Sequence, residues 1–418
     1  MPNNSNNLYF IDSIMSSDEE RFQVTLIGID EYETKSKIVE VNQNQLRMNN
    51  HSGKIKEGWY IYYDDTNQQL PFSYGNLHAY ARKQFVINNT LRKQLIDRLQ
   101  ENNSEDDEWL NNGSIDIYSY HINVGHGNCS LLLIMNEKKY SLWMVDCSKQ
   151  EIRGKSYRGN IEDCLRSIAI KVRVNVNTLH IDKFFLTHAH FDHYNGMKFL
   201  LDKNLINGSS TCYINLYYQV ASDTMNDILN TLKQKQVRII EPVPYLVNSK
   251  CISILHPECR LYKSRWGGGY SSVHSRIVSK INNSSVVFRF AFGSKSMVFT
   301  GDLEKEGFNQ MTKSASCRFF LRGINYYAVS HHGSINGHPN IVCLNHNNTN
   351  YSPITCITKG LCKSIIMGRD GAYNGVYSSQ VINHFLRCSN LLFTEKDANG
   401  NPIKYFEIDW KNDNVTYY

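Results

Sequence analysis

The feature that most constrains this chain is the stretch Thr187–Gly196, which packs three histidines and one aspartate into six consecutive positions. It follows the apolar run Phe184–Leu186, typical of a buried strand, and precedes a helix expected at Asn195–Lys203. A strand, a loop of polar side chains and a helix in this order are the context that a metal-binding motif requires. Chance clustering is the weaker explanation, even though the chain contains 15 histidines.

The residue types in this motif are those of metal ligands. Because side chains alternate along extended backbone, His188 and His190 project to the same side, while Asp192 and His193 stand where the chain turns into the helix. Imidazole and carboxylate together suit zinc, manganese or iron. The spacing allows two metal ions side by side, one held mainly by His188 and His190 and the other by Asp192 and His193.

Two later strands also end in polar residues. An apolar run at 296–299 leads into a glycine and Asp302, and the run Tyr326–Val329 leads into His331 and His332. A Gly-Asp pair alone is more often a turn, but an aspartate at this point can bridge two metals. Paired histidines at the end of a buried strand cost free energy unless they have partners, which favours a ligand role.

Polar residues also follow two strands upstream of the motif, within Tyr120–Ser130 and Trp143–Ser148. Asp146 is a candidate for orienting a metal-bound histidine. A cap or turn role explains this aspartate nearly as well.

Length and element order indicate two domains, because 418 residues exceed one ordinary core. Residues 1–110 are expected to form a small β-rich domain. An OB-like barrel and an SH3-like barrel are the alternatives for its fold, and nucleic acid or a partner protein is its expected ligand. Its expected elements are strands at 8–11, 22–27, 37–41 and 59–63, a helix at 89–100 and an acidic linker at 101–108. Strands and helices alternate over residues 111–418, which predicts an α/β domain of sheets covered by helices.

The α/β part has strand-like runs at 130–135, 140–145, 183–186, 213–218, 237–240, 285–291, 296–299, 326–329 and 364–367, and helix-like segments at 160–171, 222–235 and 378–387. No apolar run approaches the ~20 residues that span a bilayer, and no signal segment is evident, so a cytoplasmic location is expected. The eleven cysteines include no CxxC pair and are expected to be reduced thiols. A net charge of +6 is compatible with a polyanionic substrate.

In combination these segments resemble the metallo-β-lactamase fold family, and within it the hydrolase domain of DNA-uptake proteins of the ComEC type. The resemblance covers residues from about 117 to 410. Its ordered elements are Val124–Asn128, Val145–Ser148, Thr187–Gly196, Leu255–Pro257 with Asn282–Val287, Phe299–Asp302 and His331–Ser334. The chain departs from the pattern at Asn128, at Ser148 and in the loop 374–379, which affects expected substrate contacts but not the metal ligands.

The resemblance implies an αββα sandwich with two divalent metal ions, zinc first and manganese or iron as alternatives. It assigns His188 and His190 to the first metal, Asp192 and His193 to the second and Asp302 to a position between them, with Asp192 and Asp302 as the catalytic carboxylates. One of His331 and His332 would complete the second metal. The family's third histidine on the first metal has only His256 and His274 as candidates.

The reaction expected from such a site is hydrolysis, because two metals about 3.5–4 Å apart can hold a bridging hydroxide. A phosphodiesterase or nuclease acting on DNA or RNA is the first hypothesis, with Lys263, Arg265 and Trp266 as candidate substrate contacts in a glycine-containing segment. An esterase or cyclic-nucleotide phosphodiesterase acting on a small substrate is an alternative. A metal-stabilised binding or signalling module is the alternative without catalysis.

Overall fold

A computed structural model describes residues 8–16, 21–28, 36–48, 51–55, 60–64, 69, 71–73, 108–111, 114–149, 151–152, 155–215, 223–242, 249–257, 281–338, 357, 361–372 and 375–418. The chain divides into two compact units. One comprises 1–94 with 219–231 and 373–375, and the other comprises 95–218, 232–372 and 376–418. The domain boundary expected at residue 110 stays a prediction.

The first unit contains a seven-stranded sheet in the order β3-β2-β1-β6-β7-β4-β5. Its strands are β1 (Leu8–Ser16), β2 (Arg21–Gly28), β3 (Ser36–Asn42), β4 (Arg47–Met48), β5 (His51–Lys54), β6 (Tyr60–Tyr63) and β7 (Phe72–Ser73). Alternate residues such as Val24 and Leu26 are fully buried, as a sheet with one covered face requires. The β-rich character expected here is thus present, whereas the expected helix at 89–100 and residues 101–107 of the acidic run lie outside the described residues.

The second unit is built on two mixed sheets, so the α/β class expected from the sequence is confirmed for this part. The eight-stranded sheet has the order β15-β14-β13-β10-β9-β8-β22-β23, and the six-stranded sheet runs from β16 to β21 in order. Bounds in the first sheet are β8 (Asp116–Ile122), β9 (Cys129–Met135), β10 (Tyr140–Cys147), β13 (Lys183–Phe185), β14 (Thr211–Tyr213), β15 (Arg238–Ile240), β22 (Tyr405–Asp409) and β23 (Asn414–Tyr417). Bounds in the second are β16 (Ile252–His256), β17 (Val287–Phe292), β18 (Lys295–Phe299), β19 (Tyr326–Ala328), β20 (Lys363–Ile366) and β21 (Asn390–Phe393).

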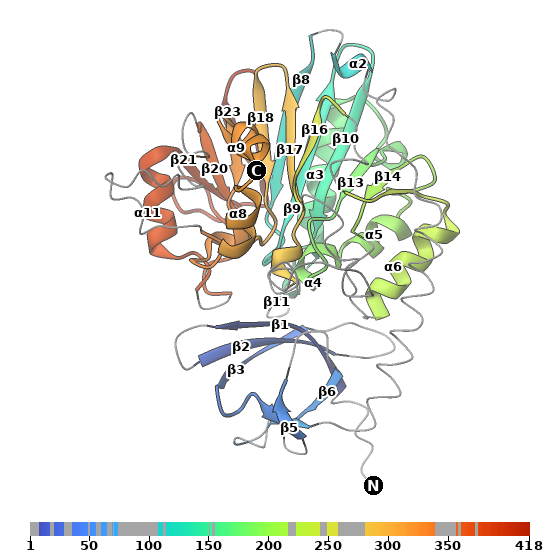
Figure 1. Cartoon of the computed structure of the whole chain (residues 1–418). Coiled ribbons are helices and arrows are strands. Elements are labelled where there is room, and N and C mark those ends of the chain that lie inside the picture. The colour runs from blue at the N-terminus through green and yellow to red at the C-terminus, as the bar shows by residue number, and fades with distance from the viewer. Residues whose placement is uncertain are drawn as a thin grey trace. The chain divides into compact units, whose positions relative to one another are not determined.

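The two sheets lie side by side in Figure 1, and the core cluster between them is rich in aromatic side chains. Trp143 of β10 meets Phe290 of β17 with ring centroids 5.6 Å apart, and Phe185 of β13 meets Phe288 at 5.1 Å. Both contacts are edge-on, the arrangement that the ring quadrupole favours. The sheets therefore pack face to face.

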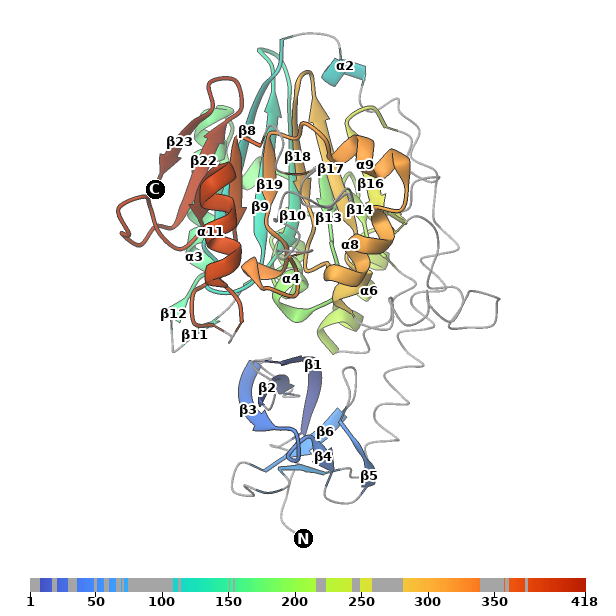
Figure 2. The same ribbon diagram turned by 60° about the vertical axis from the view of Figure 1, so that its left-hand side comes forward.

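Helices cover the outer faces of both sheets (Figure 2). On the eight-stranded sheet, α3 (Arg158–Lys171) buries Ile161, Leu165 and Ile168, which share one helical face. On the six-stranded sheet, α11 (Ser379–Cys388) places Phe385 against Tyr327 of β19, with ring centroids 5.6 Å apart. Further described helices and paired segments include α2 (Glu108–Asn111), α6 (Asp223–Gln234), α8 (Lys305–Met311), α9 (Ala315–Leu321), and the hairpin of β11 (Glu151–Ile152) with β12 (Lys155–Ser156).

Two expected elements differ from those observed. The helix expected at 195–203 is replaced by two short helices, α4 (Phe191–Tyr194) and α5 (Met197–Asp202), so the ligand motif is itself partly helical. The strand expected at 213–218 is observed as β14, which ends at Tyr213 because its parallel neighbours β13 and β15 are equally short. Position 216 and the two after it lie outside the described residues.

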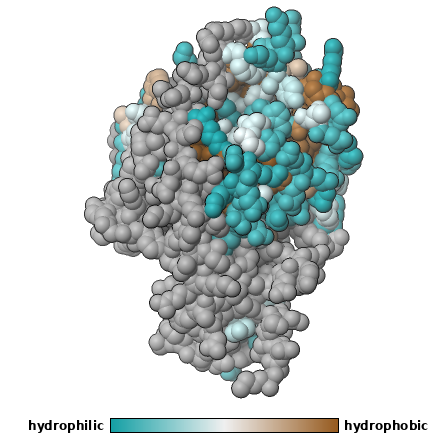
Figure 3. Space-filling view, turned by 90° about the vertical axis from the view of Figure 1, so that its right-hand side faces the viewer, coloured by the Kyte–Doolittle hydropathy of each residue, from teal (hydrophilic) through white to brown (hydrophobic). Residues whose placement is uncertain are grey.

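The described surface shown in Figure 3 is mostly hydrophilic with small hydrophobic groups. Among the described residues, no helix is long and apolar enough to cross a membrane. The described cysteines are free thiols, in keeping with the absence of CxxC pairs.

Candidate metal centre

The polar residues that follow the buried strands meet at one edge of the sandwich. Strands β10 and β13 run parallel, as do β18, β19 and β20. Parallel strands end at the same edge of a sheet, and ligands bind beyond their carboxyl ends. The motif after β13, Asp302 after β18 and the histidine pair after β19 are therefore brought together by topology.

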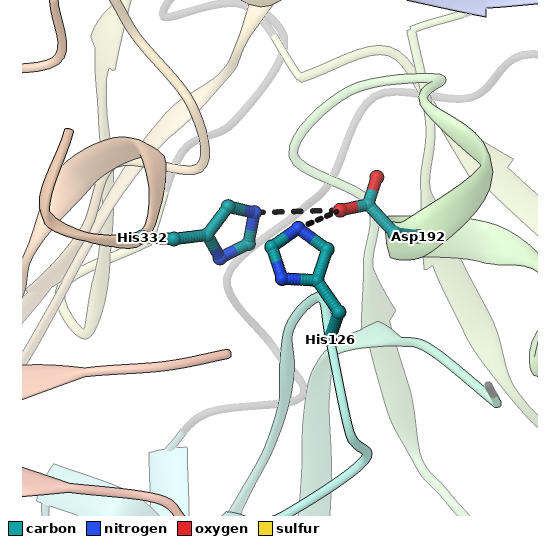
Figure 4. Close-up of side chains that lie close together, drawn as sticks. All are labelled: His126, Asp192 and His332. Carbon is teal, nitrogen blue, oxygen red and sulfur yellow. Dashed lines mark ion pairs between the residues drawn. The ribbon is translucent and has the colours of Figure 1, made fainter. Parts of the chain in front are cut away.

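The first cluster, which we call the His126 group, consists of His126, Asp192 and His332, and all three are buried. Both imidazoles face one carboxylate oxygen (Figure 4): Asp192 Oδ2 lies 3.4 Å from His126 Nε2 and 3.3 Å from His332 Nε2. The three side chains come from the turn before β9, from α4 and from the loop after β19.

The second cluster, the His188 group, consists of His188, His193 and Asp302, again all buried. Asp302 Oδ1 lies 3.3 Å from His193 Nε2, and Oδ2 lies 3.9 Å from His188 Nε2. The same Oδ2 atom lies 3.4 Å from His332 Nε2 of the first cluster. Asp302 thus stands between the two clusters.

Two further histidines of the sequence motifs lie beside the clusters without belonging to either. His190 Nδ1 is 3.1 Å from His188 Nε2. His331 is buried next to His332, with ring centroids 6.3 Å apart. Of the histidine pair after β19, it is therefore His332 that faces the aspartates.

Close backbone approaches hold the loops in place. Gly301, at φ +52°, packs on Thr187, whose Oγ1 would be 2.6 Å from a Cβ atom there. His331 and His332 both adopt left-handed backbone, with φ of 50° and 51°. Non-glycine residues in this region are uncommon and cost free energy, and they persist where surrounding structure over-determines them.

Asp146 sits directly behind the His188 group. Its carboxylate accepts hydrogen bonds from the backbone N–H of Thr187 at 2.8 Å, from the Thr187 hydroxyl at 2.7 Å and from His193 Nδ1 at 2.7 Å. Asp146 itself has a left-handed φ of 54°, at a register shift between β9 and β10. The bulge re-aims its side chain under the motif.

His332 has an equivalent support on its own side. Its Nδ1–H donates to the Met367 carbonyl at 3.1 Å, which leaves Nε2 directed at the aspartates. For His193 and His332 alike, the hydrogen bond at Nδ1 selects the tautomer whose Nε2 can bind a metal.

The electrostatics of the clusters are those of a cation site. Burial alone would raise the pKa of Asp192 and of Asp302, but the neighbouring histidines outweigh it and hold both well below their usual value. Burial opposes protonation of His332, yet Asp302 and Asp192 raise its pKa to about 9, and Asp302 and Asp146 likewise raise that of His193. The carboxylates therefore attract positive charge to this point.

The residues fit a pair of divalent ions. Among the buried atoms of the histidine and aspartate motifs, four face one another as ion-pair partners or neighbours but form no hydrogen bond: His190 Nε2, His193 Nε2, His332 Nε2 and Asp302 Oδ1. Buried polar atoms without partners are costly, typically by about 1–3 kcal/mol each. Nitrogen and oxygen donors in these numbers are what zinc prefers.

Some sequence-based candidates are placed elsewhere. His256 ends β16, and its Nε2–H donates to the Asn283 carbonyl at 3.1 Å, so this nitrogen is already used within the fold. It belongs to neither cluster. The other candidate third ligand and the three proposed substrate contacts lie outside the described residues: His274, Lys263, Arg265 and Trp266.

Sequence reasoning missed His126. It lies between Gly125 and Gly127, immediately before β9, within the Val124–Asn128 element of the resemblance, for which no metal ligand is expected. The available signal was a histidine beside glycine next to a buried strand, an arrangement that recurs at His332 and Gly333. Gly127 matters because a Cβ atom there would lie 2.1 Å from the Asp192 carbonyl oxygen.

No family model and no curated protein matches the sequence. Among solved structures, the metallo-beta-lactamase fold protein YhfI from Bacillus subtilis aligns with 13% identity over 70% of this chain and 100% of that one, with a TM-score of 0.35. Zinc-bound PqqB from Methylobacterium extorquens aligns with 10% identity over 66% of this chain and 96% of that one, with a TM-score of 0.32. A diphosphatase from the PhnP family aligns with 9% identity over 68% of this chain and 88% of that one, with a TM-score of 0.28.

Proposed function

We propose that this chain is a hydrolase of the metallo-β-lactamase type that uses two divalent metal ions, and that its substrate is a phosphodiester of nucleic acid. The observation that carries the proposal is the position of Asp302 between the two buried clusters, 3.3 Å from His193 Nε2 and 3.4 Å from His332 Nε2. A carboxylate shared in this way is the arrangement expected of a two-metal site.

The His126 group and the His188 group would hold one ion each. When bound, a pair of divalent ions supplies an activated water and stabilises the charge that develops on the attacked centre and on the leaving oxygen. Zinc is the first choice for this donor set, with manganese or iron as alternatives.

The chain's own contribution is orientation of the donors and exclusion of bulk water. Asp146 and the Met367 carbonyl fix the rings of His193 and His332, and Ser285 Oγ lies 3.1 Å from the Asp302 backbone nitrogen, which donates to it. All six cluster side chains are buried. A rigid, water-poor site strengthens electrostatic interactions with a charged substrate.

A polyanionic substrate is supported by the net charge of +6. Three arms test the substrate class on metal-loaded protein: single-stranded DNA or RNA, a small chromogenic phosphodiester with a cyclic nucleotide, and a chromogenic carboxylic ester. Nucleic acid cleavage that Asp302→Asn abolishes is expected. Turnover of the ester alone would replace the phosphodiesterase proposal, and metal binding without turnover in any arm would favour a binding module.

A further inference from the structure

The rings of His126 and His332 rest on the backbone of one glycine. Gly368 follows β20 and has a φ of +105°, a conformation that glycine adopts without strain. A Cβ atom at this position would lie 3.1 Å from His332 Nδ1 and 3.4 Å from His126 Nδ1. Each imidazole faces Asp192 through its other nitrogen, Nε2 (Figure 4). The Gly368 backbone therefore lies behind both imidazoles of the His126 group.

Two side-chain hydroxyl groups fix the carbonyl of this glycine. Tyr377 donates its phenolic hydrogen to the Gly368 carbonyl at 2.9 Å. Thr394 Oγ1 donates to the same carbonyl at 3.4 Å and accepts from the Gly368 N–H at 3.2 Å. Burial raises the pKa of the Tyr377 phenol well above its ordinary value, so the hydroxyl keeps its hydrogen and remains a donor. The shorter of the two bonds to the Gly368 carbonyl comes from Tyr377.

The residue before this glycine contacts His332 directly. The Met367 carbonyl accepts the His332 Nδ1–H at 3.1 Å. Because Met367 and Gly368 are adjacent, a rotation of the Gly368 backbone also moves the Met367 carbonyl away from the imidazole. The hydrogen bond at Nδ1 selects the tautomer whose Nε2 faces the aspartates. A bond that fixes Gly368 therefore acts on the orientation of His332.

Tyr377 is also joined to the His332 turn through its backbone. Its N–H donates to the His332 carbonyl at 3.0 Å, and the next N–H, of Ser378, donates to the Gly333 carbonyl at 3.0 Å. His332 and Tyr377 both have left-handed backbone, with φ of 51° and 54°. This conformation costs free energy in a non-glycine residue and persists where the surrounding structure over-determines it. The Tyr377 side chain is thus held in place despite an unfavourable backbone.

A purely structural role for Tyr377 is the alternative explanation. Its ring is buried and stacks on Phe393 of β21, with centroids 5.7 Å apart and an angle of 28° between the ring planes. Ring packing of this kind stabilises the fold whether or not the hydroxyl has a partner. Replacement of Tyr377 by phenylalanine separates the two roles, because it keeps the ring and the backbone bonds and removes only the hydrogen bond to Gly368.

We infer that Tyr377 is a positioning residue of the metal centre. Its hydroxyl group fixes the Gly368 carbonyl, and through that backbone it sets the orientation of the His126 and His332 rings. The Met367 carbonyl stays on His332 Nδ1 for the same reason. The inference rests on the proposed two-metal function, and it adds a side chain that acts on the candidate ligands through the backbone.

Zinc affinity tests this inference without an activity measurement. In Tyr377→Phe it should fall about 10–100-fold, the usual effect of removing an outer partner of a ligand. Competition with a chelator of known zinc affinity provides the measurement. Tyr405→Phe is the matched control, since Tyr405 is also buried and its hydroxyl lies 2.6 Å from Ser167 Oγ, outside both clusters. The control should bind zinc as wild type does, and equal affinities in the two variants would overturn the inference.

The ring N–H of His332 reports its position in metal-free protein. With ¹⁵N-labelled histidine, a hydrogen-bonded Nδ1–H that exchanges slowly with water gives a resolved proton resonance, which is assigned by its absence in His332→Gln. In Tyr377→Phe this resonance should shift and exchange faster, and in Tyr405→Phe it should stay unchanged. A merely structural tyrosine would lower the stability to urea and leave the resonance as it is in wild type. That result would also overturn the inference.

A second variant covers the case in which Tyr377→Phe folds poorly. Thr394→Val removes the other hydroxyl from the Gly368 carbonyl and keeps the shape of the side chain, so zinc affinity should fall in the same direction. Wild-type affinity in Thr394→Val would contradict a role for the Gly368 backbone. Wild-type protein that binds zinc but hydrolyses no substrate would remove the proposed function and leave this inference standing. Wild-type protein that binds no zinc would overturn both.

Discussion

His193 donates its Nδ1 proton to Asp146, 2.7 Å away, and its opposite nitrogen then faces Asp302 at 3.3 Å. Both side chains are fully buried. Because Asp146 comes from the end of β10 and His193 from α4, the bond joins the motif to the neighbouring strand. It couples the orientation of a candidate metal ligand to the sheet.

Asp146→Asn should weaken metal binding without unfolding the protein. An amide in place of the carboxylate can present its NH₂ group to His193 and favours the wrong tautomer, so zinc affinity of the His188 group should fall about 10–100-fold. Competition with a zinc-binding dye measures this. Asp163→Asn removes a surface carboxylate that pairs with Lys404 at 2.6 Å and serves as the control. Equal affinities in the two variants would contradict a role for Asp146 in positioning.

Asp302→Asn should have a larger effect, because this carboxylate faces both clusters. We expect kcat/KM for a chromogenic phosphodiester to fall by more than the roughly 100-fold expected for an outer partner of a ligand. Steady-state rates at saturating zinc provide the measurement. Asp202→Asn, at an exposed ion pair with Lys198, is the control. A loss below about tenfold in Asp302→Asn would show that the residue is not a shared ligand.

Metal-free protein should lose stability as the pH rises from 6.5 toward 9. The aspartates raise the pKa of His332 from 6.5 to about 9 against the effect of burial, so its stabilising contribution is complete below pH 6.5 and is lost as the pH passes through 9. The pKa of His193 is also raised, so this residue changes the stability in the same direction. For one group the slope is on the order of 1.4 kcal/mol per pH unit within the window.

Urea unfolding of metal-stripped protein across this pH range measures the effect. Zinc-loaded protein should lack the slope, because metal binding requires the neutral imidazoles. Asp302→Asn should reduce it, since Asp302 is the main group that favours the protonated rings. Stability that is constant or rises between pH 6.5 and 9 in the metal-free protein would contradict this account.

Gly301→Ala should destabilise the protein more than Gly293→Ala. Both glycines have left-handed backbone, with φ of 52° and 57°, so both substitutions carry the same conformational cost of roughly 1–2 kcal/mol. A Cβ at Gly301 would also meet Thr187 Oγ1 at 2.6 Å, whereas a Cβ at Gly293 has nothing within 4 Å. Denaturant unfolding compares the two, and zinc content should fall only in Gly301→Ala. Equal destabilisation would show that the Thr187 side chain moves aside at no cost in free energy.

Local pattern in the sequence was sufficient for nine strands of the second unit, but β8, β16, β21, β22 and β23 were not among the strands it predicted. Strands β9, β10, β18 and β19 contain continuous apolar runs because both of their faces are covered. Such runs predict a strand even when its neighbours in the sheet are unknown. The sequence pattern did not predict the helix boundaries at the motif correctly. Asp192 and His193 lie inside α4 because the chain must turn sharply to place them opposite Asp302.

The sequence by itself determined which donors exist and which element end each one follows, because residue type and side-chain periodicity are local properties. Only the tertiary structure decided which of them meet. His126 joins Asp192 at one edge of the eight-stranded sheet, His332 rather than His331 faces the aspartates from the other sheet, and His256 turns to a backbone carbonyl. Strand pairing and sheet packing determine which of these side chains come into contact. Both depend on contacts between segments that are distant along the chain, which residue spacing within one segment does not predict.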